Sequence, residues 1–126
     1  MAEEQTLYDA LGGKTAIEKL ITTFYEKVVD DERIGKFFQG KDVQKIRAMQ
    51  IEFFGAALDG PIKYTGLEIA RVHSGLGISR NDFNRYVQIL LQTLDELGVS
   101  SEHSTSVIDR INLYVDDVVG KGGIDG

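Results

Sequence analysis

The chain has no cysteine, and among its 126 residues there are only one proline and two histidines. Without cysteine it can form neither a disulfide nor a thiolate metal site. No apolar run approaches the roughly 18 residues that span a bilayer. The N-terminal stretch MAEEQTLYDA is acidic and lacks the apolar core of a signal peptide. We therefore expect a cytoplasmic protein that does not insert into the membrane.

Positive charge is also scarce, with 14 lysine and arginine residues against 20 acidic ones and a net charge of −6. An acidic surface repels phosphate backbones, so nucleic acid is not an expected partner. The length, with 42% hydrophobic and 27% charged residues, is typical of one globular unit with a single core. We expect residues 1–126 to form one domain that is a monomer or a weak dimer.

Four segments show the i, i+3, i+4, i+7 spacing of amphipathic helices, and no segment alternates as a strand does. A first turn in TLYDAL ends at a Gly-Gly pair, and Thr15, Asp42 and Ser79 are candidate N-caps of the next three helices. The sequence thus predicts an all-α protein. The residues expected to face inward are Ile17, Leu20, Ile21, Phe24, Tyr25, Val28 and Val29; Val43, Ile46, Met49, Gln50, Phe53, Phe54 and Ala57; Phe83, Tyr86, Val87, Leu90, Leu91 and Leu94; and Val107, Ile108, Ile111, Tyr114, Val115 and Val118.

A short helix is expected at about residues 67–74, within a region that ends in ARVHSGLG. Its inward positions are Ile69, Val72, His73 and Leu76, so the imidazole points inward with the aliphatic side chains. A helix this short is not stable by propensity alone. Some other interaction must hold it.

Three polar groups therefore lie on apolar faces: His73, Tyr25 and Gln50. Each has an ordinary explanation, since a buried histidine is often a hydrogen-bonded core residue, and Tyr25 and Gln50 might simply bond each other. A single histidine cannot build a protein-only zinc or iron site, which needs three or four ligands. It suffices for haem, which brings four ligands of its own, and a C-x-x-C-H covalent attachment is excluded.

The order and spacing of five blocks are similar to those of the truncated haemoglobins, most of all group 1. The blocks are LYDALGG, FYEKVVDDERIGKFFQG, RAMQIEFFGAALDGPIKYTG, ARVHSGLGIS and DFNRYVQILLQTLDELGV. This resemblance implies a two-over-two helical sandwich around a non-covalent haem b, iron protoporphyrin IX. It also implies that the first helix is vestigial and that the helix carrying the iron ligand is short.

The resemblance also implies roles for single residues. His73 matches the proximal iron ligand, and Phe38 matches a phenylalanine packed against the porphyrin. Tyr25 and Gln50 match the distal pair that hydrogen-bonds dioxygen. Phe53 and Phe54 match residues that line a tunnel to the iron, with Phe54 as its gate; the alternative is that both are ordinary core residues. Further haem-wall positions are Tyr64, Ile69, Val72, Leu76, Ile78, Phe83, Val87 and Leu90.

Some positions depart from the family pattern or carry less information. Ile46 stands where several members have glutamine, and it can donate no hydrogen bond. Met49 stands where relatives have lysine or histidine; we expect it in the pocket wall, with iron ligation by its thioether as the alternative. Lys45 is expected either to reach a haem propionate or to be solvated. His103 is expected to be exposed and without function.

Three functions follow as hypotheses. The first is reversible binding of dioxygen, carbon monoxide and nitric oxide. The second is a nitric oxide dioxygenase, which would form nitrate and need a separate reductase because the chain contains no flavin or nicotinamide domain. The third is a helical interaction module that has lost its cofactor, and it is disfavoured because an apolar core does not require the histidine, the tyrosine and the glutamine together.

Overall fold

The computed structural model describes residues 6–60, 77–115 and 119, and the regular elements in this part are all helical. This confirms the all-α prediction. The helix expected around His73 lies outside the described residues. The elements are α1 (Leu7–Leu11), α2 (Gly13–Asp30), the 3-10 helix η1 (Gly35–Phe38), α3 (Val43–Ala57), α5 (Arg80–Glu96) and α6 (Ser101–Asn112).

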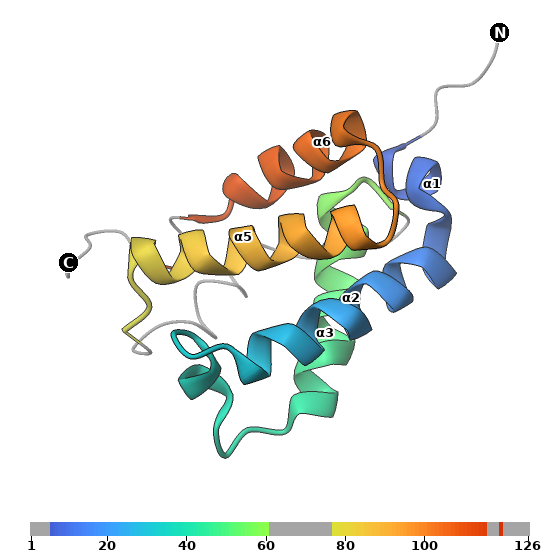
Figure 1. Cartoon of the computed structure of the whole chain (residues 1–126). Helices are drawn as coiled ribbons and strands as arrows, with labels where there is room; N and C mark the ends of the chain where they lie inside the picture. The colour runs from blue at the N-terminus through green and yellow to red at the C-terminus, as the bar shows by residue number, and fades with distance from the viewer. Residues whose placement is uncertain (1–5, 61–76, 116–118, 120–126) are drawn as a thin grey trace, which may run out of the picture.

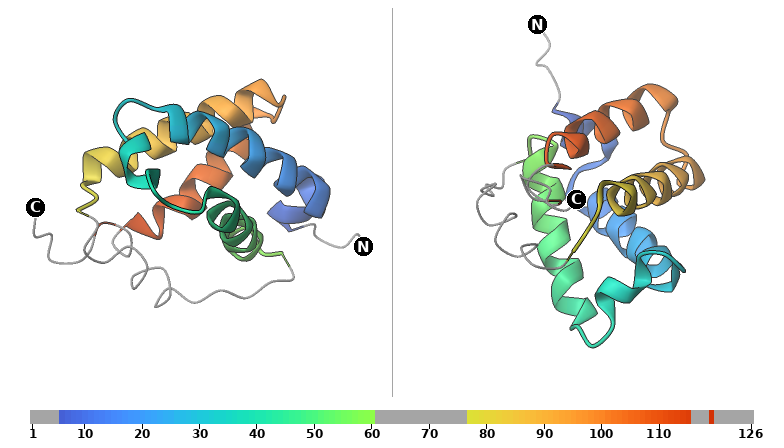
Figure 2. Two further views of the ribbon diagram at one scale, coloured as in Figure 1. Left: turned by 90° about the horizontal axis from the view of Figure 1, so that it is seen from below. Right: turned by 90° about the vertical axis from the view of Figure 1, so that its left-hand side faces the viewer.

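Helix α2 is the centre of the packing, because it contacts α1, η1, α3 and α5. It crosses α3, while α5 and α6 lie side by side (Figures 1 and 2). Most of its predicted stripe is buried, from Ile17 to Val28. The core therefore lies between the crossed pair α2 and α3 and the adjacent pair α5 and α6. No helix in the described part is both long and apolar enough to cross a membrane.

Side-chain caps start α3 and α5 where the sequence predicts them. Asp42 accepts a hydrogen bond from the backbone N–H of Lys45 (3.2 Å), and Ser79 forms a reciprocal capping box with Asp82. The predicted cap at Thr15 is wrong, because α2 already begins at Gly13. Gly12 has φ of +119°, which ends α1 and starts α2 at once, so Thr15 lies inside the first turn.

The buried face of α5 also differs from the predicted stripe. Leu91 is 47% exposed, whereas Ile89 and Thr93 are buried. Helix α5 packs on both α2 and α6, so its buried face is turned toward Ile89 and away from Leu91. The Thr93 hydroxyl donates to the carbonyl of Ile89 (2.8 Å), so the buried hydroxyl does not lack a hydrogen-bond partner.

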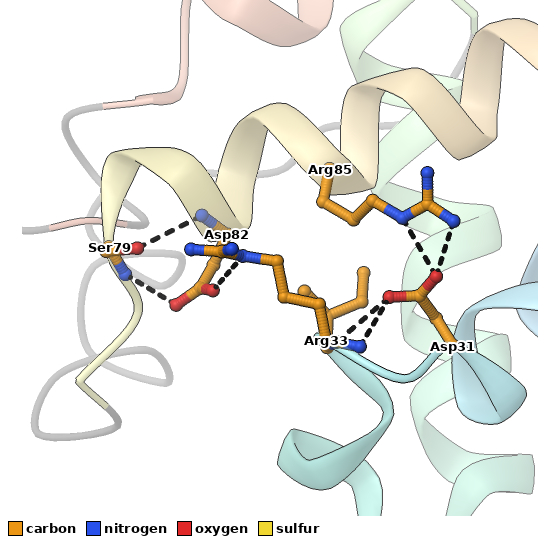
Figure 3. Close-up of polar contacts among 6 residues, drawn as sticks. Asp31, Arg33, Ser79, Asp82 and Arg85 are labelled. Atoms are coloured by element: carbon orange, nitrogen blue, oxygen red, sulfur yellow. Dashed lines mark hydrogen bonds and ion pairs between the residues drawn. The ribbon is translucent and has the colours of Figure 1, made fainter.

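Two ion pairs, side by side in Figure 3, join the turn between α2 and η1 to the first turns of α5. Arg85 donates to Asp31 (Nε to Oδ1, 2.8 Å), and Arg33 donates to Asp82 (Nε to Oδ1, 2.9 Å). The other carboxylate oxygen of Asp31 caps the turn by accepting the backbone N–H groups of Arg33 and Ile34. Both carboxylates are more than nine-tenths buried as side chains, so each is held by several donors.

These contacts lower the pKa of both carboxyls. For Asp31 the hydrogen bond from Arg85 is the main cause of the low pKa, and it outweighs the opposing effect of burial. Burial raises the pKa of Asp82, but the hydrogen bonds with Ser79 and Arg33 together outweigh it, so the net pKa is low. A carboxyl with a lower pKa in the folded than in the unfolded state stabilises the fold above its unfolded pKa.

We predict that the free energy of unfolding falls as the pH drops below about 4, through the pKa of the folded carboxyls. Asp82→Ala should lose about 1–2 kcal/mol at pH 7, because the capping box and the ion pair with Arg33 are both removed, and should respond less to acid. Asp95→Ala, an exposed carboxyl on the same helix, is the control. Urea unfolding at pH 7 and at about pH 3 measures both effects, and equal losses for the two variants would contradict the prediction.

Candidate functional site

Three helices bring together the side chains of Tyr25 on α2, Gln50 on α3 and Tyr86 on α5. The hydroxyl of Tyr86 donates to Oε1 of Gln50 (3.0 Å), and the hydroxyls of Tyr25 and Tyr86 are hydrogen-bonded to each other. We call these three residues the polar triad. Tyr25 is only 4% exposed. Tyr25 and Gln50, predicted as separate polar groups on two apolar faces, are thus linked through a third residue.

The hydrogen bonds of the polar triad run in one direction. Burial raises the pKa of Tyr25 well above its ordinary value, and Tyr86 raises it further as the acceptor of its proton. Burial also raises the pKa of Tyr86, against the smaller opposing effect of the bond from Tyr25. Both phenols are therefore neutral at physiological pH. Tyr25 donates to Tyr86, and Tyr86 donates to Gln50.

Aromatic rings surround the two phenols. Phe24 meets Tyr25 and Tyr86 edge to face, with ring centroids 5.1 and 4.9 Å away. Phe38 meets Tyr25 in the same manner at 5.6 Å, and Phe83 stacks on Tyr86 at 5.9 Å. This packing holds the tyrosine rings in place, so the hydroxyls project from a rigid apolar frame.

The other predicted pocket residues fall into three groups by exposure. Five are half-buried, four are buried, and one is exposed. The half-buried residues are Phe38, Ile46, Met49, Ile78 and Val87; the buried ones are Phe53, Phe54, Phe83 and Leu90; and Lys45 is exposed. Of the half-buried group, Phe38, Ile46 and Val87 pack against the core while keeping part of their apolar surface uncovered.

Phe54 makes the contacts of a core residue. It is fully buried, and the centroid of its ring lies 6.3 Å from that of Phe24 and 5.5 Å from that of Phe53. Phe53 in turn meets Tyr114 at 5.0 Å. These contacts fit the core alternative for both residues, and a gating role of Phe54 stays a prediction.

The predicted iron ligand His73 and the wall residues Tyr64, Ile69, Val72 and Leu76 lie outside the described residues. His103 is half-buried, so the expectation that it is exposed is wrong. It lines a surface groove between α1 and α6, together with Leu7 and Arg110, because α1 packs against α6.

The sequence analysis missed Tyr86 as a site residue. It was placed on the inward stripe of its helix, but only Tyr25, Gln50 and His73 were singled out as polar groups on apolar faces. The same criterion applied to Tyr86 would have found it, since its hydroxyl also needs a partner when its ring is buried. What the sequence could not show is that the partners come from α2 and α3.

The described residues contain no group of three or more histidine, cysteine, aspartate or glutamate side chains placed to hold a metal ion.

The comparisons with known proteins agree with the helical architecture. The bacterial-like globin family matches residues 6–119. The chain is 37% identical over 110 residues to a group 1 truncated hemoglobin of Mycolicibacterium paratuberculosis, which covers 87% of this chain and 81% of that protein. A group 1 truncated hemoglobin of Synechocystis is 39% identical over 101 residues, 77% of this chain and 82% of its own.

Solved structures give the same result. The truncated hemoglobin of Tetrahymena pyriformis in its Fe(III) form has a TM-score of 0.87 and 32% identity, covering 93% of this chain and 100% of its own. The 2/2 hemoglobin of Synechococcus, solved in the cyanomet state with covalently attached heme, has a TM-score of 0.85 and 29% identity, covering 91% and 98%. By its sequence, and by the two-over-two helical fold that it shares with these structures, the chain belongs to the bacterial-like globin family as a group 1 truncated haemoglobin.

Proposed function

We propose that this chain binds haem b non-covalently through His73 and uses Tyr25 and Gln50 to stabilise a gaseous ligand, with dioxygen as the main one. A bound haem would supply a ferrous iron whose open position takes dioxygen, carbon monoxide or nitric oxide. The proposal extends what globins have in common to this chain's own residues. Its main support is the polar triad.

The polar triad is an unusual arrangement for an apolar core. A buried polar group without a partner costs about 1–3 kcal/mol, so cores normally avoid such groups. Here the two phenols pack against the rings of Phe24, Phe38 and Phe83. The two hydroxyls and the Gln50 carboxamide are hydrogen-bonded to one another. Packing alone does not require these groups, because phenylalanine and leucine would fill similar volumes. A ligand that needs hydrogen-bond donors explains their presence.

The neighbouring residues suit a flat, largely apolar cofactor. Phe38, Ile46 and Val87 leave apolar surface uncovered beside the core, which such a cofactor would bury. Met49 is half-buried, in keeping with the pocket wall, and the exposed Lys45 is free to extend toward a propionate. Together with His73, Tyr64, Ile69, Val72, Leu76 and Ile78, these residues form the proposed haem site.

Tyr25 and Gln50 suit a ligand that accumulates negative charge. Because both phenols stay protonated, Tyr25 has a proton to donate, and the Gln50 amide has two. Dioxygen takes electron density from ferrous iron, whereas carbon monoxide takes little. Hydrogen bonds to a charged acceptor contribute about 1.5–3 kcal/mol, so these donors favour dioxygen.

Replacing the proposed iron ligand tests the haem site. His73→Ala is expected to abolish the absorption bands of haem in the purified protein and to prevent uptake of added hemin, because the only protein bond to iron is removed. His103→Ala is the matched control, since the structure places this second histidine in the groove between α1 and α6. Absorption spectra of the ferric, ferrous and carbon-monoxide forms provide the measurement. Equal haem content in both variants would refute the assignment of His73.

Replacing the distal donors tests the ligand preference. Tyr25→Phe and Gln50→Leu should each speed dioxygen dissociation by about tenfold or more, with little effect on carbon monoxide, because a hydrogen bond to a charged acceptor is lost. Stopped-flow measurement of both dissociation rates checks this. Rates of dioxygen dissociation that stay at the wild-type value in both variants would rule out the distal pair.

A further inference from the structure

Tyr86 stands in the middle of the polar triad, and neither the proposed function nor the sequence assigns it a role. It is the only member that bonds both others: it accepts from Tyr25 and donates to Gln50. Its ring is held by the stacked Phe83 and by Phe24, so its hydroxyl has little freedom to turn away. The position of the hydroxyl is therefore determined by α5 and by the aromatic packing.

The hydrogen bond from Tyr86 fixes the orientation of the Gln50 carboxamide. A carboxamide has an acceptor at one end and two donors at the other. The Tyr86 hydroxyl has one proton and donates it to Oε1 of Gln50, so this oxygen, and not the NH₂ group, faces Tyr86. Within residues 6–60 and 77–115 the Gln50 side chain makes no other hydrogen bond. The NH₂ group consequently points away from Tyr86, and in the described part of the chain it has no acceptor.

We propose that Tyr86 is a positioning residue that makes Gln50 a donor toward the ligand, by fixing the carboxamide with its NH₂ group away from α5. This inference rests on the proposed function. Without the bond from Tyr86, the carboxamide of Gln50 can also turn its oxygen toward the ligand. An oxygen in that position repels an electron-rich ligand. Tyr86 thus acts on the ligand through Gln50 and not by direct contact.

Tyr25 depends less on Tyr86. Its ring keeps its place through the contacts with Phe24 and Phe38. A small rotation about the C–O bond of Tyr25 is enough for its hydroxyl to donate to a charged ligand in place of Tyr86. Removing the Tyr86 hydroxyl takes away a competing acceptor without releasing the ring. The effect of Tyr86 should therefore require Gln50 but not Tyr25.

The test is dioxygen dissociation from the haem-loaded Tyr86→Phe variant, alone and combined with Gln50→Leu or Tyr25→Phe. We expect dissociation about fivefold faster in Tyr86→Phe, which corresponds to the loss of one neutral hydrogen bond. The increase should persist when Tyr25→Phe is also present and should disappear in the Gln50→Leu background. Carbon monoxide dissociation should not change. Tyr8→Phe removes the same atom from a ring that packs beside Gly60 and should have no effect.

Two further readouts do not depend on dioxygen. The infrared C–O stretch of the carbon monoxide form, which responds to nearby donors, should change in Tyr86→Phe and should be the same in Gln50→Leu as in Tyr86→Phe/Gln50→Leu. In the protein without haem, the loss of stability in that double variant should be smaller than the sum of the two single losses, as expected for bonded partners. A merely structural role of Tyr86 would change stability but leave the infrared band in place.

The outcomes separate this inference from the proposed function. If the wild-type protein takes up no haem, the proposed function fails and the inference fails with it. If haem binds and Gln50→Leu speeds dioxygen loss, but Tyr86→Phe does not, only the inference fails. It also fails if Tyr86→Phe has the same effect with and without Gln50, because Tyr86 would then act by another route.

Discussion

The buried stripe of α2 is the constraint on which the other contacts depend. This helix contacts α1, η1, α3 and α5, and the side chains of its stripe are almost completely removed from solvent: Ile17, Leu20, Ile21, Phe24, Tyr25 and Val28. Burial of such a stripe is the main source of stability for an amphipathic helix, because helix propensity alone contributes little. Because α2 is held on several sides at once, the phenol of Tyr25 has one position relative to α3 and α5.

The polar triad follows from that packing, because its three members lie on α2, α3 and α5. Burying the two phenol hydroxyls removes their bonds with water, and a partly satisfied network would destabilise the core. Here each hydroxyl proton has an acceptor, and no buried side-chain nitrogen or oxygen among the described residues lacks a partner. The hydroxyl protons of the triad are thus satisfied within the protein, whereas the NH₂ group of Gln50 has no acceptor among the described residues.

The two ion pairs between the turn after α2 and the start of α5 also hold these two helices in place. They tie Asp31 and Arg33, at the corner that follows α2, to Asp82 and Arg85 at the start of α5 (Figure 3). Tyr25 and Tyr86 lie further along these same two helices. By limiting how far α5 can slide or rotate against α2, the pairs help to preserve the bond between the two phenols.

The sequence determined the local features of this protein. The helical periodicity and the caps at Asp42 and Ser79 depend on neighbouring residues, and the structure confirms them. Tyr25 and Gln50 were found because a polar tip on an apolar stripe is visible in the spacing. The N-terminus of α2 and the exposure of Leu91 were predicted wrongly, because they depend on the close approach of α1 and on the two helices that share α5.

Only the tertiary structure decided that Tyr86 joins Tyr25 to Gln50 and in which direction the protons are donated. The three residues are separated by 25 and 36 positions in the chain, and no local pattern states how α2, α3 and α5 are rotated about their axes. That rotation is set by the simultaneous burial of all their apolar faces. Hydrogen bonds between side chains of different helices follow from it, and so they become visible only when the helices are packed.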